Sequence, residues 1–386
     1  MHDVVIAGGG PGGLYTAAVL ARNGLDVVLC EEHANIGAPV HCTGVLAHDA
    51  ITEFGIGAES VLNELSTVCF HAPSGATIAY TTPTVEAIVI DRLAFDRDLA
   101  ASALAAGVQV LCGSRVTDVS VDAGGTTIIT RDGRTVRARA CVLACGASYA
   151  LQRRFGLGVP EMFLQSAQAE VACARLHDVE VHFGSYVAPG GFGWAVPVER
   201  PDGAYVRVGV MSNRDAAGHF ERLLAAIASR WGATPAIDGG PRQKILPLAP
   251  IDKTFSARLL VLGDAAGLVK PTTGGGIYYS LVSAAIAADV LSNALRADDL
   301  SEKALGEYER RWRKRLSGEL EAQLALRRVA ERMTDEEIDG LFELARTDGI
   351  MPIVRRTARF NRHRDLILAL FSHPPARKIL FRALAG

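Results

Sequence analysis

The segment "DVVIAGGGPGGLYTAAVLARNGLDVVLCEE" near the start of the chain constrains the fold more strongly than any other stretch. Residues 4–7 form a short apolar run typical of a buried strand, and residues 14–22 continue as an alanine-rich helix. Residues 27–30 form a second apolar run. The order strand, tight turn, helix, strand is typical of a Rossmann-like α/β unit.

The glycines of this turn predict a dinucleotide site, because Gly8, Gly10 and Gly13 occupy the GxGxxG positions. The first permits the turn, the second lets the backbone approach a pyrophosphate, and the third allows close helix–strand packing. Free amides at the helix start favour phosphates. An acid after the second strand can accept hydrogen bonds from a ribose and disfavours a 2'-phosphate, so NAD or FAD is expected. The predicted contacts are Gly8, Gly10, Pro11, Gly13, Glu31 and Glu32.

A second motif, "ARLLVLGDAAGLVKPTTGGGIYYSLVSAAIAADVL", decides between NAD and FAD. An Asp at a strand end can hold a polyol hydroxyl, and the glycine run puts bare amides at a helix N-terminus, which suits the electron-rich edge of a flavin. A nicotinamide needs no second cradle, whereas FAD has a ribityl chain and a ring to be held. The motif therefore predicts FAD. Its predicted contacts are Gly263, Asp264, Pro271, Gly274, Gly275, Gly276 and Ile277.

This second motif resembles the GD…P…G motif of the p-hydroxybenzoate-hydroxylase-like FAD superfamily. The segment "VIDRLAFDRDLAASALAAGVQVL" is similar to a further segment of that superfamily, with Arg92 ahead of a helix. The resemblance also places Val116 and Gly146 at the cofactor. One position departs, since Cys145 stands where the hydroxylases carry the Asp of an Asp-Gly pair tied to hydroxylation. This departure disfavours a hydroxylase.

The stretch "PGGFGWAVP" resembles the PxxYxWxFP motif of the geranylgeranyl reductase family, with Phe192 for Tyr and Val196 for Phe. In that family the segment lines the substrate cavity beside the flavin. A packed hairpin with Trp194 in the core is the other interpretation. The alternation of apolar residues over 179–183 predicts an edge strand before the turn. Substrate contacts implied by the resemblance are Phe192, Trp194, Pro197, Tyr278 and Tyr279.

The segment "GAPVHCTGVL" is similar to a cysteine-containing segment of the same family. The resemblance implies that Cys42 stands near the reactive face of the flavin, where it contacts the cofactor and positions a double bond or takes part in proton delivery. A small buried residue with no chemical role is the alternative.

The resemblance implies an FAD-dependent reductase that saturates isolated C=C bonds of an isoprenoid by hydride transfer from flavin N5 plus protonation. A geranylgeranyl-type lipid, a diphosphate and a quinone side chain are all open as substrates. The electron donor, NAD(P)H or a ferredoxin-like protein, is open too. The alternative is an FAD-dependent monooxygenase of an apolar or aromatic compound. A halogenase is disfavoured because residues 33–46 contain no lysine, and an iron–sulfur electron-transfer flavoprotein is disfavoured by the scattered cysteines.

The predicted fold is α/β, with a GR2-type Rossmann-like FAD-binding domain, an inserted antiparallel β-sheet substrate domain and a C-terminal helical region. We expect the FAD-binding domain to comprise residues 1–65, 85–155 and 255–298, and the substrate domain residues 66–84 and 156–254. Residues 299–386 are expected to be helical, with Ser301 as an N-cap and Thr334 and Glu337 as a capping box.

The net charge, the basic tail and the cysteines indicate which partners and which cellular compartment to expect. The net charge of -2 gives no reason to expect nucleic acid, but residues 351–386 carry eight Lys or Arg against the single Asp365. This basic tail predicts contact with a membrane surface, and a solvated helical tail is equally open. No metal-ligand spacing joins the seven cysteines, so no metal site is expected. Without a signal-peptide pattern or a continuous apolar run of roughly 20 residues, we expect a cytoplasmic protein, soluble or peripherally attached.

Overall fold

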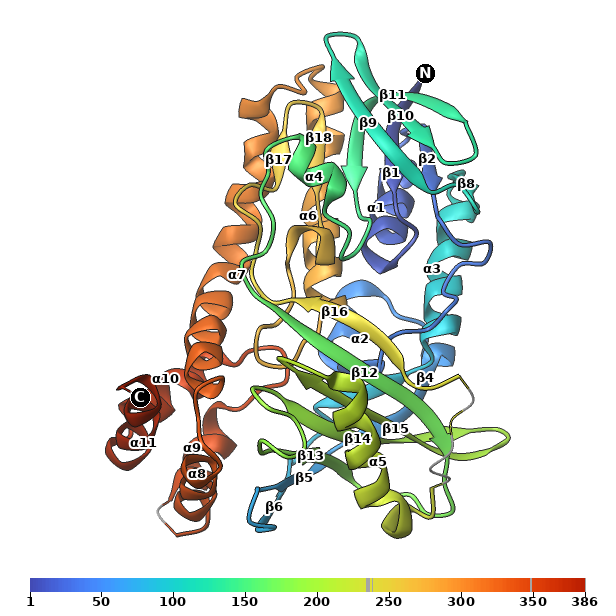
Figure 1. Ribbon diagram of the computed structural model, residues 1–386. Helices are drawn as coiled ribbons and strands as arrows, with labels where there is room; N and C mark the ends of the chain where they lie inside the picture. Colours follow the sequence, from blue (N-terminus) through green and yellow to red (C-terminus); the bar gives the residue numbers. More distant parts are fainter. Residues whose placement is uncertain (234–236, 238, 348, 386) are drawn as a thin grey trace.

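The computed structural model describes residues 1–233, 237, 239–347 and 349–385. A nucleotide-binding layer lies at the end that carries the N-terminus, a second sheet lies at the opposite end, and the C-terminal helices run along one side (Figure 1). The predicted fold class, an α/β protein with a Rossmann-like part, a second sheet and a helical C-terminal region, is confirmed.

The first sheet has eight strands in the order β17–β18–β11–β1–β2–β8, and β9 and β10 extend it from β11. Strands β18, β11, β1, β2 and β8 pair in parallel. Because their carboxyl ends meet at one edge, the loops that follow β1, β11 and β18 lie together. The bounds are β1 (His2–Ala7), β2 (Val27–Cys30), β8 (Gln109–Leu111), β9 (Val116–Asp122), β10 (Gly125–Thr130), β11 (Thr135–Leu143), β17 (Phe255–Ser256) and β18 (Leu259–Val261).

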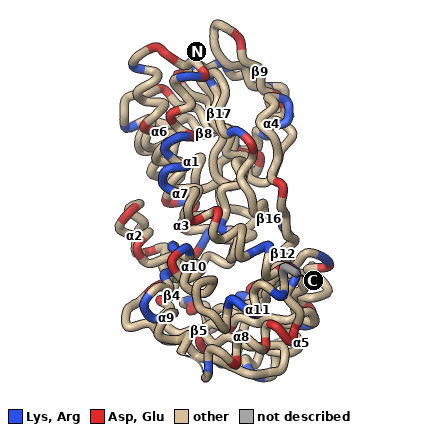
Figure 2. Tube along the Cα trace, turned by 90° about the vertical axis from the view of Figure 1, so that its left-hand side faces the viewer, with Lys and Arg blue, Asp and Glu red and all other residues tan. Residues whose placement is uncertain are grey.

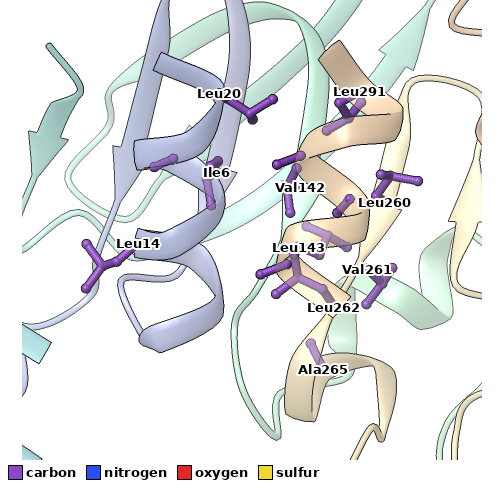
Figure 3. Close-up of a cluster of buried hydrophobic side chains, with 14 of the residues drawn as sticks. Ile6, Leu14, Leu20, Val142, Leu143, Leu260, Val261, Leu262, Ala265 and Leu291 are labelled. Atoms are coloured by element: carbon purple, nitrogen blue, oxygen red, sulfur yellow. The ribbon is translucent and has the colours of Figure 1, made fainter. Parts of the chain in front are cut away.

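The core of this layer is formed between the parallel strands and the helices α1 (Pro11–Arg22), α3 (Arg92–Ala105) and α6 (Ile277–Arg296). Figure 3 shows Ile6 of β1 and Val142 of β11 among side chains from α1, β18 and α6. All of the labelled side chains are buried. Helix α6 is long and apolar enough to cross a membrane, but 67% of its most apolar window is buried inside the protein, as in the core helix of a globular layer. Burial of these apolar surfaces fixes the edge where the two glycine motifs meet.

The second sheet, which we call the cap sheet, has the strand order β16–β12–β15–β14–β13–β5–β6. Helix α5 (Ala216–Trp231) covers one face with an apolar stripe that includes Phe220 and Trp231. The bounds are β5 (Thr67–His71), β6 (Thr77–Thr81), β12 (Phe163–Ala172), β13 (Val179–His182), β14 (Phe192–Arg200), β15 (Gly203–Ser212) and β16 (Arg242–Pro247).

The prediction that residues 179–183 form an edge strand was wrong. Strand β13 pairs antiparallel with β14 and parallel with β5, so it lies inside the sheet, and the cap sheet is antiparallel apart from that one pair. The reason is a long-range one: the hairpin of β5 and β6, from much earlier in the chain, adds to the outer side of β13. The alternation within a single strand carries no information about such a neighbour.

A small sheet of β3 (Val45–Ala47), β7 (Ala87–Ile90) and β4 (Val61–Leu65) lies between the two large ones, in the order β3–β7–β4. Four short helical segments lie in the connections between these strands and helices. They are α2 (Asp49–Phe54), η1 (Ala58–Ser60), α4 (Ala150–Arg154) and η2 (Gly263–Ala266).

The C-terminal region consists of α7 (Glu302–Ala330), α8 (Asp335–Thr347), α9 (Ile350–Thr357), α10 (Arg364–Ser372) and α11 (Pro374–Ala385). Both predicted caps are confirmed. The Ser301 hydroxyl accepts from the amide of Ala304 at 3.3 Å, and Thr334 and Glu337 exchange two hydrogen bonds at the start of α8. Helix α7 packs on α6 and β17 of the nucleotide-binding layer. The helices that follow it, α8 to α11, lie beside the cap sheet, where α8 contacts β6.

Candidate active site

One cavity of about 1280 Å³ is lined by all three parts of the protein: the nucleotide-binding layer, the cap sheet and helices α7 to α11. Typical small-molecule pockets have roughly 300–1,000 Å³. The volume is therefore sufficient for a dinucleotide together with a second ligand.

The first glycine turn forms one end of this cavity. Gly8 has a φ of 115°, and a Cβ there would lie 2.3 Å from the Ala144 carbonyl oxygen. A Cβ at Gly13 would lie 2.0 Å from the carbonyl oxygen of Gly8, so these two glycines are required by backbone packing. At Gly10 no atom lies within 4 Å of the Cβ position, and the residue faces the cavity. A turn with open space at this glycine fits the pyrophosphate of FAD.

Glu31 is held at the rim of this cradle. One carboxylate oxygen accepts from the amide of Gly9 at 2.7 Å, and the other accepts from the amide of His33 at 2.9 Å. The buried carboxylate lines the cavity at the end of β2, where a ribose hydroxyl can reach it. Glu32 lines the cavity as well, and its carboxylate pairs with Arg115 at 3.2 Å.

The second glycine motif lies in the same cavity. A Cβ at Gly276 would lie 2.5 Å from a carboxylate oxygen of Asp264, which leaves room there for glycine only. Asp264 also pairs with Lys244 of β16 at 3.5 Å, so the predicted polyol-binding acid contacts the cap sheet. Pro271 does not line the cavity, whereas the other predicted FAD contacts do. These are Gly8, Gly10, Pro11, Gly13, Glu31, Glu32, Cys42, Arg92, Val116, Gly146, Gly263, Asp264, Gly274, Gly275, Gly276 and Ile277.

Arg92 and Cys42 lie side by side at the cavity wall. The Arg92 guanidinium donates to both carboxylate oxygens of Asp96, at 2.9 and 3.1 Å, and its Nε is buried without a partner. Burial lowers the pKa of Arg92, but Asp96 and Cys42 outweigh it and hold the pKa above its ordinary value. The Cys42 sulfur accepts from the amide of Gly44 at 3.3 Å. The structure thus presents a thiol next to a fixed cation.

An aromatic wall runs from β14 to α8. Trp194 and Phe192 have ring centroids 5.8 Å apart, Phe192 and Phe183 6.3 Å, and Phe183 and Phe342 6.1 Å. All four line the cavity. A Cβ at Gly209 would lie 2.2 Å from the Trp194 ring, so this tryptophan packs on the cap sheet and lines the cavity as well.

The remaining predicted substrate contacts divide into two groups. Tyr278 lines the cavity, and its hydroxyl donates to Glu53 at 2.7 Å. Pro197 and Tyr279 do not line it. Tyr279 of α6 is buried, and its hydroxyl accepts from Gln323 of α7 at 3.1 Å.

Lys270 is a residue of the site that was not predicted from the sequence. It lines the cavity with 3% of its surface exposed, and its Nζ donates to Asn361 at 2.7 Å and to the carbonyl of Phe360 at 3.0 Å. Burial lowers the pKa of Lys270 to about 7. His363, near Phe360 and Asn361 in sequence, is half-buried, and desolvation followed by the charge of Lys270 lowers its pKa to about 4. The sequence feature that could have indicated a buried lysine is its place directly after the apolar residues of "GLVK", ahead of the glycine run.

A cluster of His71, Glu180 and His182 in the cap sheet has the composition of a metal site, with candidate ligand atoms within 4.8 Å of one another. The Glu180 carboxylate is already engaged, because Arg230 donates to it at 2.5 and 2.9 Å and the Trp231 ring nitrogen at 3.0 Å. Burial raises the pKa of Glu180, but hydrogen bonds from His182 and Arg230 lower it to about 2. We interpret the cluster as a buried ion-pair network that ties β13 to α5.

Comparison with known proteins matches the chain to one family model, to curated reductases and to solved structures. The family model described as lycopene cyclase protein matches residues 3–333. A digeranylgeranylglycerophospholipid reductase from Methanocaldococcus jannaschii is 32% identical over 362 residues, which cover 89% of this chain and 90% of the relative. A geranylgeranyl bacteriochlorophyll reductase-like structure from Thermoplasma acidophilum superposes with a TM-score of 0.85 at 23% identity and covers 99% of both chains. A probable FAD-dependent monooxygenase from Pseudomonas aeruginosa shares the fold at a TM-score of 0.68 and 21% identity, over 89% of this chain and 99% of the other.

Substitution of Gly10 tests the cradle without disturbing packing. Since its Cβ position is open and its φ is -80°, Gly10→Ala should fold normally but crowd the pyrophosphate. We expect the affinity for FAD to fall by roughly tenfold or more, as measured by flavin titration of the apoprotein. Gly318→Ala in α7, where the nearest side chain is 3.4 Å away, is the matched control. Equal FAD affinity of the two variants would contradict this assignment.

Lys270 should make stability depend on pH in a defined window. Its folded pKa of about 7 lies below the ordinary value of 10.5, so between these values the unfolded chain binds the additional proton. Stability contributed by this group therefore rises as pH increases above 7. Relative to Lys270→Met, the wild-type free energy of unfolding should gain about 1 to 2 kcal/mol between roughly pH 7 and 8.5 in urea denaturation. Lys314→Met, at an exposed position of α7, should follow the wild type, and identical pH profiles for all three would contradict the assignment.

Proposed function

The chain belongs to the family of the lycopene cyclase protein model and to the geranylgeranyl reductases, and we propose that it is an FAD-dependent reductase of isolated C=C bonds in isoprenoid lipids. The observation that carries the proposal is the single cavity that joins the two glycine cradles to the aromatic wall and the apolar faces of α8 to α11. Aromatic and aliphatic walls without polar handles suit a prenyl chain.

An isolated alkene has no carbonyl to absorb electrons, so the protein must hold it in place and keep water away. When bound, FAD supplies the hydride equivalent. Trp194, Phe192 and Phe183 would hold the prenyl chain in a fixed orientation. The Cys42 thiol lines the same cavity beside Arg92, and we propose that it delivers the proton to the second alkene carbon while Arg92 fixes its position.

We further propose that NAD(P)H or a ferredoxin-like protein reduces the flavin in a cytoplasmic setting and that the C-terminal helices rest on an anionic membrane. Figure 2 shows Lys and Arg over α9 to α11. Leu368 of α10 and Phe381 of α11 have 46% and 53% of their surfaces exposed. Cations beside exposed apolar groups are typical of membrane-surface helices.

Vesicle binding tests the membrane contact. The protein should sediment with phosphatidylglycerol vesicles at low salt, and the bound fraction should fall several-fold with the double variant Leu368→Asp, Phe381→Asp, because both exposed apolar groups become charged. Leu104→Asp, at an exposed position of α3, is the control. The proposal fails if both proteins sediment alike.

Anaerobic turnover tests the reductase. Protein reduced with dithionite should convert geranylgeranyl diphosphate or a geranylgeranyl glycerolipid to products heavier by two mass units per reduced bond, as shown by mass spectrometry. Cys42→Ala should retain FAD and lower the rate by about 100-fold or more, with Cys112→Ala, at an exposed cysteine, as the control. A product heavier by sixteen units, formed only with oxygen, would instead identify a monooxygenase.

A further inference from the structure

Lys270 belongs to the second glycine cradle as well as to the cavity wall. Its backbone N–H donates to the Gly275 carbonyl at 3.1 Å, and its own carbonyl accepts from the Gly274 amide at 2.9 Å, so the lysine closes the turn that presents these glycines. The Cδ atom of its side chain lies 3.6 Å from the Cβ position of Gly275. The stem of Lys270 therefore runs beside the glycines that are predicted to hold the flavin.

The ammonium of Lys270 has neutral hydrogen-bond partners, the Phe360 carbonyl and the Asn361 side chain. Its Nζ also lies 4.8 Å from the ring centroid of Phe360 and 5.9 Å from that of Tyr278. Among the described residues, the lysines that form ion pairs are two others, those at positions 244 and 253. A buried cation with neutral partners alone is costly, and an anion in the cavity would offset that cost.

Three carboxylates surround the loop that accepts from Lys270. Asp49, Glu86 and Glu319 each accept a hydrogen bond from residues 360–364, at 2.8 to 3.4 Å. Burial lowers the pKa of Lys270 to about 7, and the charges of Asp49 and Glu319 offset only part of that effect. The carboxylates therefore support the loop and leave the ammonium without a direct counter-ion.

The glycine run beside Lys270 is the part of the site predicted to hold the N1–C2=O edge of the flavin. Two-electron reduction with protonation at N5 leaves a negative charge on that edge. A cation in the same turn stabilises the reduced cofactor more than the oxidised one, because only the reduced edge carries the charge.

We propose that Lys270 pairs with the negatively charged N1–C2=O edge of reduced FAD and thereby raises the reduction potential of the bound flavin. This inference rests on the proposed function for the presence of FAD, and it is independent of which compound is reduced. Its consequence is that the electron donor needs less reducing power to load the flavin.

Midpoint potentials measured by anaerobic dye equilibration test the proposal. Lys270→Met keeps the length of the side chain and removes its charge, and Lys270→Gln is a second neutral variant. At pH 6.5 we expect the reduction equilibrium constant of bound FAD to fall by about tenfold or more, which equals about 30 mV for two electrons. Lys314→Met, at an exposed position of α7, is the matched control and should keep the wild-type potential.

Asn361→Leu separates the charge of Lys270 from its part in packing. This variant removes one acceptor of Nζ and keeps the ammonium, so the reduction equilibrium constant should fall by less than about threefold. An equal fall in Asn361→Leu and Lys270→Met would assign the effect to the position of the loop and overturn the proposal.

Proton uptake on reduction is a second readout. A negative charge beside Lys270 raises its pKa from about 7, so above pH 7 reduction takes up one proton at N5 and another at Lys270. Between pH 7 and 8 the reduction equilibrium constant should fall about 100-fold in the wild type and about tenfold in Lys270→Met. His363, with a pKa lowered to about 4, and Tyr278, with a pKa raised to about 12, do not titrate in this range, and the three carboxylates are common to both proteins.

Equal potentials of the wild type and Lys270→Met, or equal slopes with pH, would overturn the inference even if an alkene were reduced. A potential that depends on Lys270, without reduction of any alkene, would support the inference and contradict the reductase.

Discussion

The close approach of α1 and α6 is the constraint on which the rest of the structure depends. A Cβ at Gly12 would lie 2.4 Å from the Ser280 hydroxyl, so α1 has no room for a side chain at this point, where the Ser280 side chain of α6 packs against its backbone. Each helix follows a strand of the same parallel sheet, and both N-termini therefore face the same edge. Two glycine cradles from distant parts of the chain become one site. Amides and helix dipoles from both helices then favour the phosphates and the electron-rich edge of a flavin.

The cap sheet and the C-terminal helices convert that edge into an enclosed, apolar space. Helix α7 is anchored to the nucleotide-binding layer by buried aromatic residues: the Tyr308 hydroxyl donates to the Val261 carbonyl at 2.8 Å, and the Trp312 ring nitrogen to Thr254 at 2.9 Å. The helices that follow face Phe183 and the aromatic wall of the cap sheet. Hydride transfer to an isolated alkene needs such an enclosure, because the reacting chain offers the protein nothing to hold except its shape.

Local patterns predicted the parts of the site whose chemistry is encoded within a few residues. The GxGxxG turn, the second glycine run, the family resemblance and both helix caps follow from local spacing, and the structure and the comparisons confirm the fold class and the family. The roles assigned to individual site residues stay predictions. The site features that could not be predicted from the sequence depend on contacts between distant segments. Burial of Lys270, for example, depends on its hydrogen bonds to Phe360 and Asn361, about 90 residues further along the chain. Likewise, Pro197 belongs to the resembling motif but does not line the cavity.

The most direct test of the central claim, that one cavity holds both flavin and lipid, is an experimental structure of the protein with FAD and a saturated, unreactive prenyl phosphate. We predict the flavin between the two glycine cradles and the prenyl chain along Trp194, Phe192 and Phe183, within reach of Cys42. A prenyl chain bound outside this cavity, or a flavin separated from it by protein side chains, would contradict a shared cavity.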